Sequence, residues 1–283
     1  MSDKDLWLSG GAAEPPPPPP QRRKVLVALG GLTLVAGGGV AAGIAAATRS
    51  ANSRTTPTTS PSGTRPAGGT PSASASPSAP GKTTAVATKP QYYVDNDGPK
   101  AIALTMDDGP HPVYTPQVLE ILRKYDIKAT FNMIGRQVGS NLSLVREVSA
   151  AGHTITNHTW NHADLTHATY PQACSQIDRC NDALANANQH PTIFRAPYGN
   201  WSTAAFRACA ARDLKPVDWS VDPHDWDTAH VDTQDIVRTV LRTTKPHDII
   251  LEHDGGGVRR NTVAALKIFI PRLLAEGYDF VAI

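Results

Sequence analysis

Short apolar runs and amphipathic segments alternate along the chain from residue 100 to the C-terminus. The run Ala101–Thr105 predicts a buried strand, and Thr115–Tyr125 places its large apolar residues at helical spacing. Further strands are expected at Lys128–Ile134, Thr154–Thr156, Thr192–Phe194, Lys215–Val217, Ile249–Leu251 and Phe280–Ile283. Further helices are expected at Leu142–Ala151, Pro171–Ala187, Thr203–Arg212, Thr233–Arg242 and Val263–Glu276. This alternation is typical of parallel βαβ units and predicts an α/β fold, a distorted (β/α) barrel of about seven parallel strands.

The first ninety residues of the chain follow a different pattern, which divides them into three segments. Residues 1–24 are polar and Pro-rich, residues 25–47 contain no charged side chain, and residues 48–90 are rich in Ser, Thr, Pro and Ala. More than about 18 uncharged residues in a row are typical of a membrane-spanning helix. Arg22-Arg23 before them also resembles a twin-arginine export signal. A buried core helix is the alternative interpretation of residues 25–47.

We therefore expect a cytoplasmic tail (1–24), a transmembrane or signal segment (25–47), an extended linker (48–90) and one globular domain (91–283). The globular domain would be exported. It would face the cell exterior as a membrane-anchored domain or be secreted after signal cleavage, and the sequence leaves this choice open.

Charge is distributed unevenly between these parts. The chain has a formal net charge of +2, yet residues 1–90 carry nine Lys or Arg and only three Asp or Glu. Residues 91–283 carry eighteen Lys or Arg and twenty-two Asp or Glu, so the globular domain is mildly acidic. It contains no cluster of basic residues interleaved with aromatic ones, which argues against nucleic-acid binding.

Polar side chains recur just after the predicted strands. They are Asp107, Asp108, Asn157, His158, Arg195, Asp222, Asp225, His253 and Asp254. The carboxyl ends of parallel strands meet at one edge of a barrel, and chemistry takes place at this edge. Adjacent carboxylates such as Asp107 and Asp108 also need a compensating cation if both are to stay ionised. The pattern therefore predicts a functional site at this edge.

His158 and His162 are four residues apart, so on one helical turn both imidazoles would face the same way. Together with a carboxylate from Asp107-Asp108 they would form a two-histidine, one-carboxylate metal site. Zinc is the metal we expect most, and cobalt, nickel and iron accept the same ligands. Two surface histidines without a metal are the alternative interpretation of this pair.

The chain contains three cysteines, Cys174, Cys180 and Cys209. An exported domain favours a disulfide. Cys180 falls on an inward-facing helical stripe, and the next helix offers Cys209 near Phe206. We therefore expect a Cys180–Cys209 disulfide, with Cys174 unpaired, and three buried thiols are the alternative.

Five short motifs, taken together and in this order, resemble those of the NodB-homology polysaccharide deacetylases, carbohydrate esterase family 4. The motifs are TMDDGP at Thr105–Pro110, HTWNH at His158–His162, RAPYG at Arg195–Gly199, DPHDW at Asp222–Trp226 and LEH at Leu251–His253. The resemblance covers essentially everything from residue 100 onward. Met106 departs from it, because the family usually has an aromatic residue there, but this exchange of apolar residues touches no ligand.

The resemblance implies a role for each motif residue. It assigns Asp108, His158 and His162 to the metal, Asp107 to the general base and His253 to the general acid. It also implies that Arg195 steadies Asp107 and that Asp225 pairs with His253. The substrate side would be formed by the backbone N–H of Tyr198, facing an oxyanion, and by Tyr198, Trp226 and Leu251 around an acetyl pocket. Structural roles, an ion pair for Arg195 and a turn cap for Asp225, are the alternatives.

These assignments predict a metal-dependent hydrolase that releases acetate from N-acetylated sugars in a polysaccharide such as peptidoglycan or chitin oligomers. An O-deacetylase acting on acetylated xylan is an alternative, because the same site would hydrolyse an ester. A wall-binding protein that has lost catalysis is a second alternative. The intact Asp107 and His253 argue against it, since a binding protein needs neither.

Overall fold

The computed structural model describes residues 86–95 and 98–283. The segments expected at 1–24 and 25–47, and nearly all of the linker expected at 48–90, lie outside these residues. Within the part of the chain that is described, no helix is both long enough and apolar enough to cross a bilayer.

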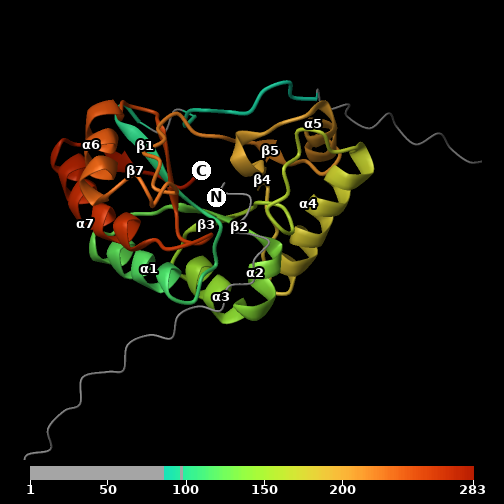
Figure 1. Cartoon of the computed structure of the whole chain (residues 1–283), viewed down its shortest axis with the longest axis horizontal. Coiled ribbons are helices and arrows are strands. Elements are labelled where there is room, and N and C mark those ends of the chain that lie inside the picture. The colour runs from blue at the N-terminus through green and yellow to red at the C-terminus, as the bar shows by residue number, and fades with distance from the viewer. Residues whose placement is uncertain (1–85, 96–97) are drawn as a thin grey trace, which may run out of the picture. The chain divides into compact units, whose positions relative to one another are not determined.

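In the described residues seven strands form a parallel sheet (Figure 1), in which β1 lies between β2 and the edge strand β6. The strands are β1 (Ala101–Asp107), β2 (Thr130–Met133), β3 (Thr154–Asn157), β4 (Ile193–Phe194), β5 (Lys215–Pro216), β6 (Ile249–His253) and β7 (Asp279–Phe280). Their order is β5-β4-β3-β2-β1-β6, and β7 pairs with the start of β1. Every residue of β1 is buried, as expected for a strand covered on both faces.

The sheet curls into a distorted, incompletely closed barrel. Beyond β5, Val221 pairs in parallel with Ile250 of β6, so the segment that follows one edge strand reaches the other edge of the sheet. Gln91, from the N-terminal end of the domain, pairs with Val217 beside β5. The predicted α/β architecture with parallel strands is therefore confirmed.

The helices cover the outside of the curled sheet (Figure 1). They are α1 (Tyr114–Lys124), α2 (Gly135–Ser140), α3 (Leu142–Ala150), α4 (Tyr170–Ala185), α5 (Thr203–Ala210), α6 (Thr233–Thr243) and α7 (Arg260–Ala275). They contact one another in the spatial order α6-α7-α1-α3-α2-α4-α5, which follows the curve of the strands. The large apolar cluster between helices and sheet includes Leu104, Val118, Phe131, Leu266 and Phe269.

Two strands at the site are longer than predicted. β1 continues two residues past Thr105 and β6 two residues past Leu251, so Asp107 and His253 end these strands as register partners. Hydropathy underestimates both strands because their last residues are polar, although these residues are buried. The short helix α2 was not predicted at all.

The expected helical turn through His158 and His162 is wrong. The backbone there forms a turn in which Thr159 and His162 have φ angles of 65° and 61°. The Asn157 carboxamide accepts a hydrogen bond from the Thr159 N–H at 2.8 Å and fixes this turn. The two imidazoles still come together, with ring centres 5.1 Å apart, but a loop and not a helix positions them.

The expected Cys180–Cys209 disulfide is also wrong, because all three cysteines are free thiols. Cys180 packs in the large cluster and donates to the carbonyl oxygen of Met133 at 3.4 Å. Cys209 lies in a second cluster, between α4 and α5, against which Cys174 also packs. The expectation that Cys180 faces the interior is confirmed, but Cys180 and Cys209 belong to different apolar clusters.

Candidate active site

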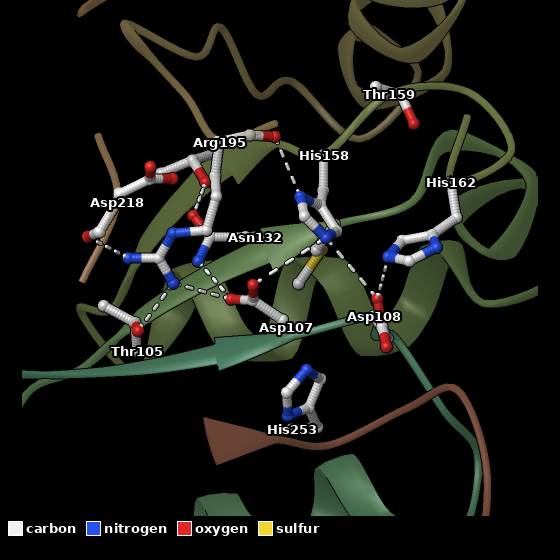
Figure 2. A network of polar contacts seen from close by, with 12 residues as sticks. Thr105, Asp107, Asp108, Asn132, His158, Thr159, His162, Arg195, Asp218 and His253 are labelled. Atoms are coloured by element: carbon white, nitrogen blue, oxygen red, sulfur yellow. Dashed lines mark hydrogen bonds and ion pairs between the residues drawn. The ribbon is translucent and has the colours of Figure 1, made fainter. Parts of the chain in front are cut away.

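The end of β1 turns two consecutive carboxylates toward the same imidazole. In a regular strand neighbouring side chains point to opposite faces, but Asp108 has a φ of 74°, in the left-handed region. As a result, oxygens of both Asp107 and Asp108 approach His158 Nε2, at 3.7 and 3.5 Å (Figure 2). Gly109 permits the turn, because a Cβ there would lie 2.5 Å from an oxygen of Asp254.

Asp108, His158 and His162 form a compact, buried group of ligand atoms. One atom from each lies within 4.8 Å of the other two, and His162 Nε2 is 3.2 Å from Asp108 Oδ1. His158 Nδ1 lies 2.9 Å from the carbonyl oxygen of Arg195. Because a carbonyl can only accept, Nδ1 carries the proton and Nε2 presents its lone pair to the carboxylate.

This group fits a divalent cation. Asp108 Oδ1 is buried and receives no hydrogen bond, although a buried carboxylate oxygen normally needs a donor or a cation. Burial alone would raise the pKa of Asp108, but the imidazoles of His162, His158 and His253 hold it below its usual range. Burial lowers the pKa of His162 to about 4, so this imidazole is neutral at pH 7, as metal binding requires.

Asp107 is held from the other side by a fully buried arginine. Arg195 Nη1 donates to Asp107 Oδ1 at 2.8 Å and to Thr105 at 2.7 Å, and its Nη2 donates to the carbonyl oxygen of Asp218 at 2.9 Å. Asn132 donates a second hydrogen bond to the same oxygen of Asp107 (Figure 2). Thr156 in turn donates to Asn132 Oδ1, which orients the carboxamide. These contacts leave Asp107 Oδ2 directed toward His158.

His253 approaches the two aspartates from β6, on the side away from His158 in Figure 2. Its Nδ1 is 2.6 Å from Asp225 Oδ1, and its backbone N–H donates to Asp225 Oδ2 at 2.9 Å. Thr262 donates to that second oxygen at 2.6 Å. Burial would lower the pKa of His253, but the Asp225 carboxylate outweighs it and raises this pKa to about 9. Burial would raise the pKa of Asp225, but His253, Arg259 and Thr262 outweigh it and lower this pKa to about 2.

The three residues predicted on the substrate side, Tyr198, Leu251 and Trp226, lie in different surroundings. Tyr198 is half-buried with a φ of 62°, and its ring packs edge-on against His162 with centres 4.5 Å apart. Leu251 is buried on β6, two residues before His253 and therefore on the same face of the strand. Trp226 follows Asp225 and packs against the ring of His224.

Several residues of the site were not predicted from sequence. Thr105, Asn132, Asp218, Arg259 and Thr262 all contact Asp107, Arg195 or Asp225 through hydrogen bonds. Asn132 had a recognisable signal, since it is a polar residue near the end of an apolar strand. Of the polar residues expected at strand ends, Asp222 instead accepts a hydrogen bond from the backbone of His224 and caps a turn. Asp254 is buried and accepts a hydrogen bond from Thr115.

Comparisons with known proteins agree with this geometry. The polysaccharide deacetylase family model matches residues 95–217. A peptidoglycan-N-acetylglucosamine deacetylase of Bacillus cereus is 40% identical over 200 residues, which cover 69% of this chain and 93% of that protein. A chitooligosaccharide deacetylase of Sinorhizobium fredii is 38% identical over 193 residues, which cover 64% of this chain and 89% of that protein.

Among solved structures, a CE4 family pseudoenzyme from Bacillus anthracis superposes with a TM-score of 0.64 at 27% sequence identity. The superposition covers 71% of this chain and 68% of the pseudoenzyme. The fold, the five motifs in order and these relatives agree, and they show that this chain belongs to the polysaccharide deacetylase family.

Proposed function

We propose that this protein is a metal-dependent hydrolase that removes N-acetyl groups, as acetate, from N-acetylglucosamine polysaccharide such as peptidoglycan or chitin oligomers. The observation that carries the proposal is the buried group of Asp108, His158 and His162, whose ligand atoms lie within 4.8 Å of one another beside Asp107. Relatives at 40% and 38% identity are named as deacetylases of these two substrates, which supports the substrate class.

The cation would be held by Asp108 Oδ1 and by the Nε2 atoms of His158 and His162. Zinc suits two imidazoles and one carboxylate with coordination positions left open, and cobalt or nickel would accept the same ligands. When bound, the cation would lower the pKa of water and polarise the acetyl carbonyl.

Asp107 is the proposed general base. Arg195 and Asn132 hold its Oδ1, so its Oδ2 is the oxygen left to accept a proton. That oxygen would take the proton from the water that attacks the acetyl carbonyl carbon. Arg195 would act through Asp107, by holding the carboxylate in this orientation.

His253 is the proposed general acid. Asp225 keeps it protonated at neutral pH, because the pKa of His253 is raised to about 9. Its Nδ1–H is used in the bond to Asp225, so Nε2 carries the proton that would pass to the leaving amine nitrogen.

The remaining roles concern the acetyl group itself. We assign the developing oxyanion to the backbone N–H of Tyr198, whose ring packs against His162. Tyr198, Trp226 and Leu251 would form the walls of the acetyl pocket. A small apolar slot of this kind favours a methyl group over larger acyl chains.

Acetate release tests the proposal and separates it from its alternatives. The purified protein should release acetate from peptidoglycan or chitin oligomers and lose this activity when the metal is chelated. Faster release from acetylated xylan would make the protein an O-deacetylase. Retention on insoluble glycan with no acetate release from any substrate would instead support a silent wall-binding protein, an alternative kept open by the pseudoenzyme that shares this fold.

We also propose that the catalytic domain works outside the cytoplasm, on the evidence of sequence alone. Arg22-Arg23 followed by the uncharged residues 25–47 supports export, and residues 48–90 would form a spacer between membrane and cell wall. Cell fractionation with and without Arg22→Lys and Arg23→Lys would test this, because a twin-arginine signal should lose export on that change. Unchanged export would favour a membrane anchor, and retention of the native protein in the cytoplasm would refute the proposal.

A further inference from the structure

The turn that carries Asp108 is one that most residues avoid. Asp108 has a φ of 74°, and a left-handed conformation is unfavourable for a residue with a Cβ, so it persists only where the surrounding structure holds it. The backbone of β2 and of the residue after it holds one side of this turn. The Asp108 N–H donates to the carbonyl oxygen of Asn132 at 3.2 Å. The carbonyl oxygen of Gly109 accepts from the Ile134 N–H at 2.9 Å.

On the side of β6 the turn is covered by Asp254 and Gly255, the first two residues after that strand. The Asp254 N–H donates to the carbonyl oxygen of Asp107 at 3.0 Å. A Cβ on Gly109 would lie 2.5 and 2.6 Å from the two carboxyl oxygens of Asp254, so both oxygens lie against the Gly109 backbone. A Cβ on Gly255 would likewise collide with the carbonyl oxygen of Asp108. The turn and the loop after β6 therefore pack directly against each other.

The carboxyl group of Asp254 is itself oriented by Thr115. Thr115 is fully buried in the first turn of α1, and its hydroxyl donates to Oδ2 of Asp254. The same hydroxyl accepts a hydrogen bond from the His111 N–H at 2.8 Å. Thr115 thereby joins Asp254 to the loop that leads from the Asp108–Gly109 turn into α1.

A carboxyl group at this position is unfavourable in itself. Asp254 is 0% exposed, and in the described part of the chain its Oδ1 receives no hydrogen bond, which is uncommon for a buried polar atom. Asp254 also lies outside the compact group of ligand atoms that contains Asp108, so it is placed to act on a cation through Asp108. An apolar side chain could fill the same space without an unpaired oxygen, but it could not accept the hydrogen bond from Thr115.

We propose that Asp254 is a positioning residue: its carboxyl group, oriented by Thr115, holds the Asp108–Gly109 turn from the side of β6. The inference rests on the proposed function, because the cation that Asp108 would bind belongs to that function. Without Asp254 the turn would relax toward an ordinary conformation, and Asp108 Oδ1 would leave its place 3.2 Å from His162 Nε2. Residues that orient metal ligands typically contribute about 10- to 100-fold to metal affinity.

The zinc affinity of the full chain, measured by titration against a competing chelator, tests the proposal without any turnover. Asp254→Ala removes the carboxyl group and should weaken zinc binding by about 10- to 100-fold. Asp254→Asn keeps the shape of the side chain and an oxygen that accepts from Thr115, so it should recover most of the affinity. An Asp254→Ala variant that binds zinc as tightly as the unchanged protein would overturn the proposal.

Asp248, the residue before β6, provides the matched control at the other end of the same strand. It is buried, and it accepts hydrogen bonds from the Ser220 hydroxyl at 2.7 Å and from the Lys245 N–H at 2.6 Å. Asp248→Ala should therefore lower the stability in urea and leave the zinc affinity unchanged. Equal losses of zinc affinity in Asp248→Ala and Asp254→Ala would mean that β6 is loosened as a whole, and would refute a specific role for Asp254.

A crystal structure of Asp254→Ala without metal tests the geometry directly. We expect Asp108 to leave the left-handed region or its Oδ1 to move away from His162. If this variant does not fold, Thr115→Val removes the donor to Asp254 and should also lower the zinc affinity, whereas Thr115→Ser keeps the hydroxyl and should not. An unchanged turn in Asp254→Ala, or an unchanged affinity in Thr115→Val, would contradict the proposed role.

These measurements also separate the inference from the proposed function. If the unchanged protein bound zinc but released no acetate from any substrate, the proposed function would fail, while the zinc affinities would still decide the role of Asp254. If acetate release were normal and Asp254→Ala kept its zinc affinity, only the inference about Asp254 would fail.

Discussion

Asp107 and Asp225 are buried aspartates at the same edge of one barrel, but their partners prepare them for opposite tasks. Asp107 has one oxygen held by Arg195 and Asn132, and its other oxygen is left to receive a proton. Asp225 has both oxygens occupied, by the His253 ring, the His253 backbone and Thr262. The first arrangement suits a base, and the second suits the support of an acid.

The cations beside the two aspartates explain the difference. The Arg195 guanidinium cannot give up a proton at any working pH, so it can orient Asp107 without competing for the proton of a water molecule. The His253 imidazolium can give up its proton, and the pKa of about 9 makes it available as an acid. In the proposed function an aspartate would therefore serve as the base where its partner is Arg195, and would support the acid where its partner is His253.

The largest loss of activity is expected when the proposed general acid, His253, is replaced. His253→Asn removes the transferable proton and should lower kcat by about 10²–10⁴, the usual contribution of a general acid. Acetate release across the pH range measures both the loss and the disappearance of the alkaline limb. His190→Asn, at an exposed histidine, is the control and should leave activity unchanged. A His253 variant that keeps its rate would assign the acid elsewhere.

Replacing Arg195, which holds the proposed base Asp107, should lower the stability of the protein as well as its rate of turnover. Arg195→Met leaves the Asp107 charge buried without its cation, which should cost about 3–5 kcal/mol of unfolding free energy. Arg238→Met breaks an exposed pair with Asp235 on α6 and should cost at most about 1 kcal/mol. Urea denaturation of both variants checks this contrast, and equal losses would show that Arg195 is no more than another ion pair.

The smallest expected effect comes from Asp225→Asn, which should lower the pKa of His253. Asp225→Asn removes the charge that raises the pKa of His253, so this pKa should fall from about 9 to or below its ordinary value, since burial alone lowers it. Activity should then fall by about tenfold or more at pH 8 and by less at pH 6. The alkaline limb of Arg195→Met should not move in this way, because Arg195 acts on the base.

The same shift has a consequence for stability with a definite sign. The folded-state pKa of His253 lies above its unfolded value, so its pairing with Asp225 stabilises the protein fully below about pH 6.5. This contribution is lost as the pH rises from there through about 9. Melting temperatures should therefore converge for Asp225→Asn and the unchanged protein at high pH, and a gap that widens there would contradict the assignment.

The fold could be predicted from the sequence because strands and helices alternate along the chain and each type has a recognisable apolar pattern. Buried parallel strands are short apolar runs, and the helices between them show a clear apolar stripe, as Val118 and Leu122 do in α1. What failed depended on contacts between distant parts of the chain. The short helix α2 has no stripe of its own, and the interior positions of Cys180 and Cys209 could not reveal that they belong to different clusters.

The candidate metal ligands could be predicted from the sequence, but the residues that orient the site could not. Asp108, His158 and His162 stand in motifs, and the structure brings their ligand atoms within 4.8 Å. The turn that orients the imidazoles depends on the Asn157 side chain and on two left-handed residues, which helical spacing could not suggest. Asn132 lies inside a strand, where its role follows only from the partners that folding places beside it.

The most direct test of the whole account measures bound metal and acetate release in Asp107→Asn, with His162→Ala alongside. The account predicts that Asp107→Asn binds as much metal as the unchanged protein and releases no detectable acetate, while His162→Ala loses both. Asp107→Asn that turns over normally, or that loses its metal together with its activity, would contradict the separation of base and ligand on which the account rests.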